Sequence, residues 1–265
     1  MVSAYKVGIG IGDIAIRFST THEGLASTLC ERYKGFLVNT RKFDCEFEIE
    51  TVPPQQISSQ EDVSVARRED QWVLERGDFR ATWAPCLGNG LLRQTVNPYS
   101  IDTVLRIVHS IMLANEGGFL LHASSVIRNG KAFLFSGVSG AGKTTISRLA
   151  PPDAMLLTDE ISYVRRDGDG YRAYGTPFAG ELARNGENTS GAIATVFFLA
   201  KGSWNYTEPI SPAAAARQLL RNLLFFAQDP KLVAELFETA VDFVARVPTK
   251  QLTFLPENTV WDLIK

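Results

Sequence analysis

The sequence contains few cysteines, no long apolar run and no concentration of charge of either sign. Its three cysteines are widely spaced and form no C-x-x-C pair, so we predict neither a disulfide framework nor a zinc site. No apolar run reaches about 18 residues and no signal peptide is recognisable, so we expect a cytoplasmic protein without a membrane span. The formal net charge is −2 and no run of Lys or Arg exceeds two residues, which argues against a nucleic-acid surface.

Two further motifs are absent or incomplete. The serine-hydrolase elbow G-x-S-x-G does not occur. Gly8, Gly10 and Gly12 alternate, but a strand-like stretch follows them where a dinucleotide-binding motif requires a helix. Hydrophobic residues make up 45% of the chain and charged residues 21%, which is ordinary for a globular protein that buries a core.

The residues that are present predict two domains of α+β or α/β class. Residues 1–97 form a small β-rich domain, because residues 43–50 alternate strictly between apolar and polar side chains. Its other predicted elements are strands at 4–18, 63–67, 71–76, 79–84 and 91–96, a helix at 23–34, and a loop between 53 and 62. Residues 98–265 form a second domain with a mixed sheet and flanking helices. Its predicted elements are helices at 100–115, 212–227 and 230–245, strands at 119–128, 131–136, 155–158, 193–200 and 251–255, and a helical tail at 260–264.

A complete G-x-x-x-x-G-K-[ST] motif occupies residues 137–144, between an apolar strand and a helix-compatible run. Glycines in such a loop let backbone N–H groups turn toward phosphate oxygens, the lysine reaches the β- and γ-phosphates, and the final hydroxyl binds Mg²⁺. We therefore predict a nucleoside triphosphate site, with ATP and Mg²⁺ as its ligands. Its predicted contacts are Gly137, Ser139, Gly140, Ala141, Gly142, Lys143, Thr144 and Thr145.

Two other elements carry side chains suited to phosphoryl transfer. Asp159 and Glu160 end a short strand, where carboxylates can hold Mg²⁺ or accept a proton. A solvated acidic pair at a turn is the alternative interpretation. His122 lies on the strand before the Asn129-Gly130 hairpin, which can return it to the level of the loop. A buried structural histidine is the alternative there.

Taken in order, the segments 121–126, 135–144 and 157–160 resemble the HPr serine kinase/phosphorylase family. That family has a histidine on the preceding strand, a G-x-S-G-x-G-K-[ST] loop and an acidic pair one strand later. The loop is also similar to that of ATP-dependent phosphoenolpyruvate carboxykinase, which shares the nucleotide-binding core. The likeness extends over roughly residues 117–200 and covers the N-terminal domain poorly.

The resemblance implies a role for each matching residue. Lys143 would contact the phosphates and Thr144 the Mg²⁺, Asp159 and Glu160 would share the roles of metal ligand and base, and His122 would assist near the acceptor. Glu181 would be a further metal ligand. The family's R-G-x-G segment is missing after Glu181, which argues against HPr as the substrate and against phosphorolysis. The chain looks more like HPr-kinase-related proteins encoded beside peptide-modification genes, some of which phosphorylate peptides.

These observations predict an ATP-dependent phosphotransferase, a serine kinase whose acceptor is a hydroxyl group of a peptide or protein. Two alternatives stay open: a kinase of a small hydroxylated metabolite such as free serine, and a regulatory protein that binds ATP without transferring phosphate. The apolar helices at 212–227 and 230–245 are explained by core packing. The resemblance to a family of hexamers raises a homo-oligomer contact as the alternative.

Overall fold

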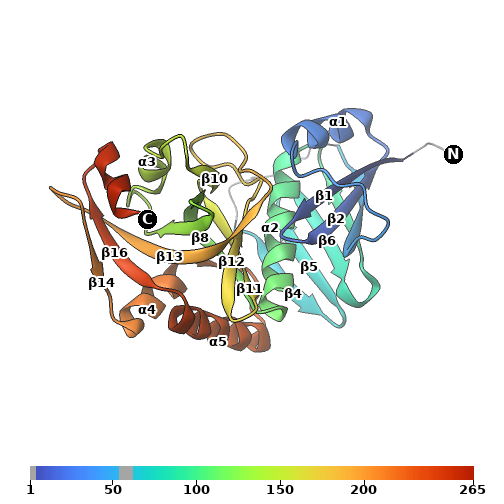
Figure 1. Ribbon diagram of the computed structural model, residues 1–265. Coiled ribbons are helices and arrows are strands. Elements are labelled where there is room, and N and C mark those ends of the chain that lie inside the picture. The colour runs from blue at the N-terminus through green and yellow to red at the C-terminus, as the bar shows by residue number, and fades with distance from the viewer. Residues whose placement is uncertain (1–3, 54–61) are drawn as a thin grey trace. The chain divides into compact units, whose positions relative to one another are not determined.

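The computed structural model describes residues 4–53 and 62–265, which divide into two compact units (Figure 1). Unit 1 comprises Met1–Ile111 with Phe226–Pro230, and unit 2 comprises Met112–Phe225 with Lys231–Lys265. The division falls inside the helix α2 (Pro98–Asn115), whereas the sequence places the boundary between residues 97 and 98. Each unit contains a mixed sheet and helices, so the α+β class is confirmed. Most of the loop predicted between residues 53 and 62 lies outside the described residues.

Unit 1 is a seven-stranded sheet in the order β1-β2-β3-β7-β6-β5-β4. Its elements are β1 (Tyr5–Ile11), β2 (Ile14–Thr20), α1 (Glu23–Arg32), β3 (Cys45–Thr51), β4 (Ser64–Arg68), β5 (Gln71–Arg76), β6 (Phe79–Ala84), the 3₁₀ turn η1 (Pro85–Leu87) and β7 (Asn89–Gln94). Alternate side chains are buried along β2, as a half-buried strand requires. On this face the rings of Phe18 and Phe47 stack with centroids 5.6 Å apart, and Gly90 leaves the space that the Phe47 ring fills.

The single strand predicted at residues 4–18 is wrong, because the chain turns in its middle. β1 and β2 form an antiparallel hairpin in which Ile11 pairs with Ile14. The two turn residues, Gly12 and Asp13, both have positive φ, at 57° and 68°. Such a two-residue turn matches the twist of a hairpin, and glycine and aspartate tolerate it best. The apolar side chains occupy odd positions before the turn, up to Ile11, and even positions after it, from Ile14. This change of phase was the available signal for the turn.

Unit 2 is built on a nine-stranded sheet system. Its elements are β8 (Gly118–Arg128), β9 (Lys131–Ser136), α3 (Lys143–Arg148), β10 (Met155–Thr158), β11 (Ile161–Asp167), β12 (Gly170–Tyr174), β13 (Ser190–Lys201), β14 (Tyr206–Pro209), α4 (Pro212–Asn222), β15 (Leu223–Leu224), α5 (Pro230–Arg246), β16 (Thr249–Phe254) and η2 (Asn258–Leu263). The strands β8, β11, β12, β13 and β9 pair in a closed ring. The long strands β8 and β13 close this ring because each exchanges one partner for another along its length.

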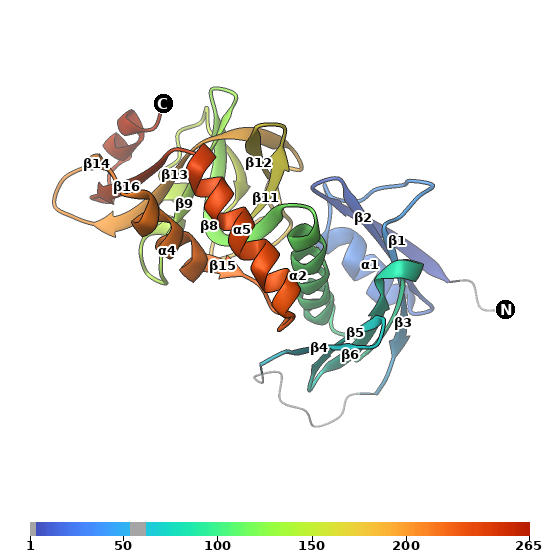
Figure 2. The same ribbon diagram turned by 90° about the horizontal axis from the view of Figure 1, so that it is seen from below.

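Strand β9 is buried on both faces. Leu134 packs into a core cluster that includes residues of α4 and α5, whereas its neighbours Phe133 and Phe135 pack into a second cluster with α3 and η2. In Figure 1, α3 lies on the opposite side of the strands from α4 and α5, and in Figure 2 α4 and α5 lie in front of the strands. A strand that is covered on both faces has consecutive apolar residues rather than alternating ones. Such a run directly precedes the glycine-rich loop in the sequence.

The helix predicted at 212–227 ends earlier than its apolar pattern suggests. Helix α4 stops at Asn222, and Leu223 and Leu224 pair instead with Leu121 and Leu120 of β8. Hydrogen bonding to a strand edge replaces the last helical turn, a tertiary effect that the local pattern does not contain. Among the helices in the described part of the chain, none is both long and apolar enough to cross a membrane.

Candidate functional site

The glycine-rich loop connects β9 to α3 and follows the backbone path that its glycines permit. Gly140 and Gly142 have φ values of 76° and 109°, which residues with a Cβ rarely adopt. A Cβ on Gly142 would lie 2.6 Å from the ring of Phe254, and one on Gly137 would lie 2.8 Å from the Cβ of Ala141. The loop therefore presents backbone rather than side chains along its inner surface.

The side chain of Lys143 folds back into this loop and is buried. Its Nζ donates hydrogen bonds to the carbonyl oxygens of Gly137 at 2.8 Å and Val138 at 3.2 Å. Burial lowers the pKa of Lys143, while the carboxylates of Glu160 and Glu181 oppose that shift. The loop thus encloses one cation, with two carboxylates facing it.

Strand pairing brings His122 to the end of the loop's entry strand. Ala123 of β8 pairs with Ser136, the last residue of β9, and His122 pairs with Ile161 at the start of β11. The Ser136 hydroxyl donates a hydrogen bond of 3.2 Å to the His122 carbonyl oxygen. His122 therefore lies where β8 passes from one partner strand to the other. Burial and the nearby Lys143 ammonium lower the pKa of its imidazole.

The two residues of the acidic pair have different surroundings. The carboxylate of Asp159 is buried and accepts two backbone hydrogen bonds, from Gly180 N–H at 2.9 Å and from Leu182 N–H at 2.8 Å. Glu160 is half-buried and faces Lys143. Asp159 therefore fixes the position of the segment 180–182, and this segment presents Glu181 between its two anchored amides.

All of these groups line one pocket of about 300 Å³. Its lining consists of His122, Ser139, Gly140, Gly142, Lys143, Thr144, Thr145, Asp159, Glu160, Gly180 and Glu181. Of the residues predicted from the sequence, Gly137 and Ala141 do not line it: Gly137 accepts the Lys143 hydrogen bond, and Ala141 N–H donates to the Val138 carbonyl at 3.1 Å. Sequence reasoning missed Gly180, although a glycine directly before the candidate ligand Glu181 was the available signal.

Gly180 is required by the packing of the acidic pair. A Cβ at this position would lie 2.9 Å from the Asp159 Oδ2 atom and 2.9 Å from the Glu160 Cβ. Both distances are far below an ordinary contact, so the segment reaches the acidic pair only because residue 180 has no side chain.

The pocket fits a magnesium-bound polyphosphate by the chemistry of its donors. A lysine ammonium and exposed loop backbone suit phosphate oxygens, and the Thr144 hydroxyl with the carboxylates of Glu160 and Glu181 offers the hard oxygen ligands that Mg²⁺ prefers. Within residues 4–53 and 62–265, no group of three or more His, Cys, Asp or Glu is arranged to hold a metal by itself. Mg²⁺ usually keeps several waters and binds through few carboxylates plus substrate phosphates, so a complete protein cage is not needed.

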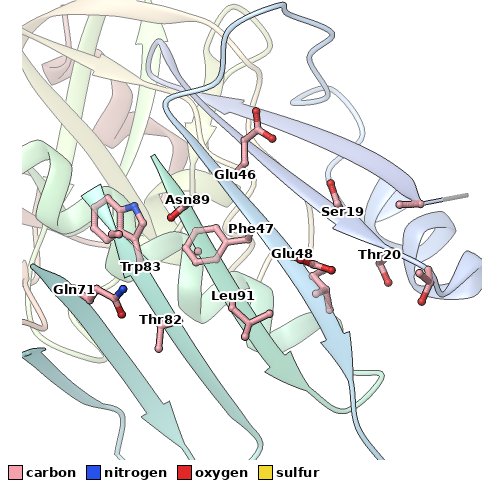
Figure 3. A pocket seen from close by; sticks show the side chains of 15 residues that line it. Ser19, Thr20, Glu46, Phe47, Glu48, Gln71, Thr82, Trp83, Asn89 and Leu91 are labelled. Carbon is pink, nitrogen blue, oxygen red and sulfur yellow. The ribbon is translucent and has the colours of Figure 1, made fainter. Parts of the chain in front are cut away.

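A larger hollow of about 580 Å³ lies on the sheet of unit 1 (Figure 3). Polar side chains such as Glu46, Glu48, Thr82 and Asn89 line it, together with the partly exposed Leu91. Its lining includes two glutamates and neither lysine nor arginine. A polyphosphate would meet repulsion there without a neutralising cation, so the chemistry of phosphate binding points to the pocket of unit 2.

Comparison with known proteins gives one family and a weak structural similarity. A family model described as "SynChlorMet cassette protein ScmC" matches residues 90–265. No protein with a curated description matches the chain. Among solved structures, the Hpr(Ser) kinase/phosphatase from Coxiella burnetii is 12% identical, with a TM-score of 0.26, over 46% of this chain and 87% of that one. A similarity this low does not indicate a function.

Proposed function

The chain belongs to the family described as SynChlorMet cassette protein ScmC, and we propose that it is a kinase that transfers the γ-phosphoryl group of Mg·ATP to a hydroxyl group. The acceptor we propose is a serine of a peptide or protein. One observation carries the proposal: an ammonium inside a glycine-rich loop, an imidazole and carboxylates converge on a single pocket. This set contains a phosphate cradle, oxygen ligands and a proton acceptor, the parts that phosphoryl transfer needs.

Each residue has a role that follows from its surroundings. The loop backbone and Lys143 bind the phosphates and balance their charge. Thr144 and the Glu181 carboxylate would hold Mg²⁺, which when bound neutralises the charge of the β- and γ-phosphates. His122 is kept neutral by its lowered pKa and can hydrogen-bond to the acceptor hydroxyl.

We assign the proton transfer to Glu160. As the acceptor oxygen forms its bond to the γ-phosphorus, the bond from that phosphorus to the bridging oxygen breaks, ADP leaves, and the hydroxyl proton moves to the Glu160 carboxylate. Asp159 is less suited to this step because each of its two oxygens already accepts a backbone N–H. It is instead a positioning residue that holds the segment carrying Glu181.

The proposal is tested by transfer from γ-labelled ATP with Mg²⁺ in an extract of the native cells. We expect labelled, acid-stable peptide or protein with the wild type and loss of at least about a hundredfold with Lys143→Ala, because the phosphates lose their buried cation. Lys131→Ala, which removes an exposed lysine of the β8–β9 hairpin, is the matched control and keeps activity.

Other outcomes identify the alternatives. Label in a small molecule other than phosphate indicates a metabolite kinase such as a kinase of free serine. Saturable ATP binding without any transfer indicates a regulatory protein gated by nucleotide. Unchanged transfer by Lys143→Ala contradicts a catalytic site in this loop.

A further inference from the structure

One exposed aromatic pair lies where the turn after β13 enters β14. Trp204 is 68% exposed as a whole residue, and Tyr206 is 37% exposed. Their centroids are 6.3 Å apart with a tilt of 35°. The other three tryptophans of the chain are buried, at 2% to 4% exposure. An indole ring left in solvent gives up the stabilising free energy that burial of its apolar surface contributes.

The strand order places this pair at the same edge of the sheet as the glycine-rich loop. β9 and β16 both run parallel to β13, so the carboxyl ends of all three strands lie together. Phe198 of β13 pairs with Ser136, and β13 then continues as far as Lys201, alongside the start of the loop. Ligands of open α/β sheets bind at this edge, beyond the carboxyl ends of the strands.

A chain of contacts joins the aromatic turn to the loop. The Gly142 backbone lies against the ring of Phe254, at the end of β16. Gly202 N–H donates to the Phe254 carbonyl oxygen at 3.2 Å, and the next residue, Leu255, donates its N–H to the Asn205 side chain at 2.8 Å. Asn205 also donates to the Thr259 hydroxyl at 3.0 Å. The residues on both sides of Trp204 are therefore fixed to the segment that supports Gly142.

The pocket itself offers nothing for a nucleobase. All of its lining residues are glycines or polar side chains, and His122 is its single ring. Bases commonly bind to proteins by stacking on aromatic faces, and the one ring of this pocket, His122, is assigned to the acceptor. The base of a bound nucleotide must then lie outside the pocket, on a neighbouring surface.

We propose that Trp204, supported by Tyr206, is the platform on which the base of the nucleoside triphosphate stacks. The proposal rests on the proposed function, since it assumes that the phosphates occupy the loop. The ligand class is an aromatic base attached to a polyphosphate. The turn offers the base the planar apolar face of the Trp204 indole. Asn205 holds the turn in place through both polar atoms of its side-chain amide.

Calorimetric titration with two ligands tests the platform separately from the loop. Mg·ATP carries a base, whereas Mg·tripolyphosphate carries phosphates alone. We expect Trp204→Ala to raise the Kd of Mg·ATP by about 5- to 150-fold, the range for loss of one base–aromatic stack, and to leave the Kd of Mg·tripolyphosphate unchanged. Trp204→Phe keeps an aromatic face and retains most of the affinity. Phe237→Ala, which removes an exposed ring of α5, is the matched control and changes neither value.

The outcomes separate the two proposals. If Trp204→Ala changes neither Kd, or raises both equally, the platform is overturned while the loop assignment stands. If the wild type binds neither ligand, the proposed function fails and the platform fails with it.

Fluorescence gives a second and independent readout. Because Trp204 is the exposed member of the four tryptophans, acrylamide quenches mainly its emission. We expect Mg·ATP to protect that emission from acrylamide and Mg·tripolyphosphate to leave it accessible. Equal quenching with and without saturating Mg·ATP overturns the platform.

Discussion

At the scale of single residues, His122 lies half-buried near the Lys143 ammonium, and burial and that charge lower its pKa. A histidine in an unfolded chain titrates near 6.5. As the pH falls through this value, the unfolded state binds a proton that folded His122 does not yet bind. The free energy of unfolding therefore falls with decreasing pH until the lowered pKa of the folded state is passed.

The expected fall in the free energy of unfolding can be measured by urea unfolding between about pH 7.5 and pH 5. We expect the wild type to lose stability over this range more steeply than His122→Gln, because the variant lacks the group whose pKa differs between the two states. The remaining histidines are common to both proteins and cancel in the comparison. Parallel pH profiles would contradict a lowered pKa at His122.

At the scale of elements, the segment 180–182 is held in the site by a side chain rather than by a strand. Asp159→Asn replaces one acceptor oxygen by an amide donor, so either Gly180 or Leu182 loses its hydrogen bond. Gly180→Ala introduces a Cβ 2.9 Å from the same carboxylate. Both changes displace Glu181, and we expect each to lower kcat by about 10- to 100-fold, the scale of a misplacement near 1 Å.

Separate measurements of kcat and of nucleotide affinity distinguish a loss of positioning from a loss of folding. We expect the Kd of ATP measured without Mg²⁺ to change by less than about threefold, since the loop and Lys143 that contact the phosphates are untouched. Gly170→Ala is the matched glycine control, because its nearest neighbour would be an Asp167 oxygen at 3.9 Å. Full turnover by Asp159→Asn would rule out a positioning role.

The elements show which parts of the fold a sequence discloses. The sequence predicts that His122 lies at the level of the glycine-rich loop. The structure agrees, because the β8–β9 turn fixes the register of these two strands. The strand at Leu223 was missed because it depends on pairing with β8. The turn at Gly12 was missed although the apolar positions change there from odd to even numbers. Gly180 was missed for a similar reason: its partner Asp159 lies 21 residues earlier, and only folding brings them into contact.

At the scale of the whole molecule, the residues of the candidate site all lie in unit 2. A ligand that binds only the folded state adds about 2.7 kcal/mol of stability at a concentration one hundred times its Kd. We expect Mg·ATP to slow amide hydrogen exchange in β8 and α3 of unit 2 and to leave β5 and β6 of unit 1 unchanged. Mass spectrometry of exchanged peptides measures this, with Lys143→Ala as the control that removes the effect.

Equal protection of both units would contradict a nucleotide site confined to unit 2. Protection of unit 1 alone would assign the ligand to the hollow of Figure 3 instead.

The two sides of the candidate site, β8 with His122 and the segment 180–182 with Glu181, differ in how firmly they are held. Leu121 pairs with β11 on one edge and β15 on the other, and Val126 likewise has β9 and β10 as its two partners. The strand that carries His122 can open only when several neighbouring strands separate. The segment 180–182 is held by the two hydrogen bonds of one carboxylate and by the packing of Leu182 on the core. Local opening thus costs less on the side that presents Glu181 than on the side that presents His122. Under the proposed function, a bulky acceptor would enter and leave by displacement of the segment 180–182, while β8 holds His122 in place.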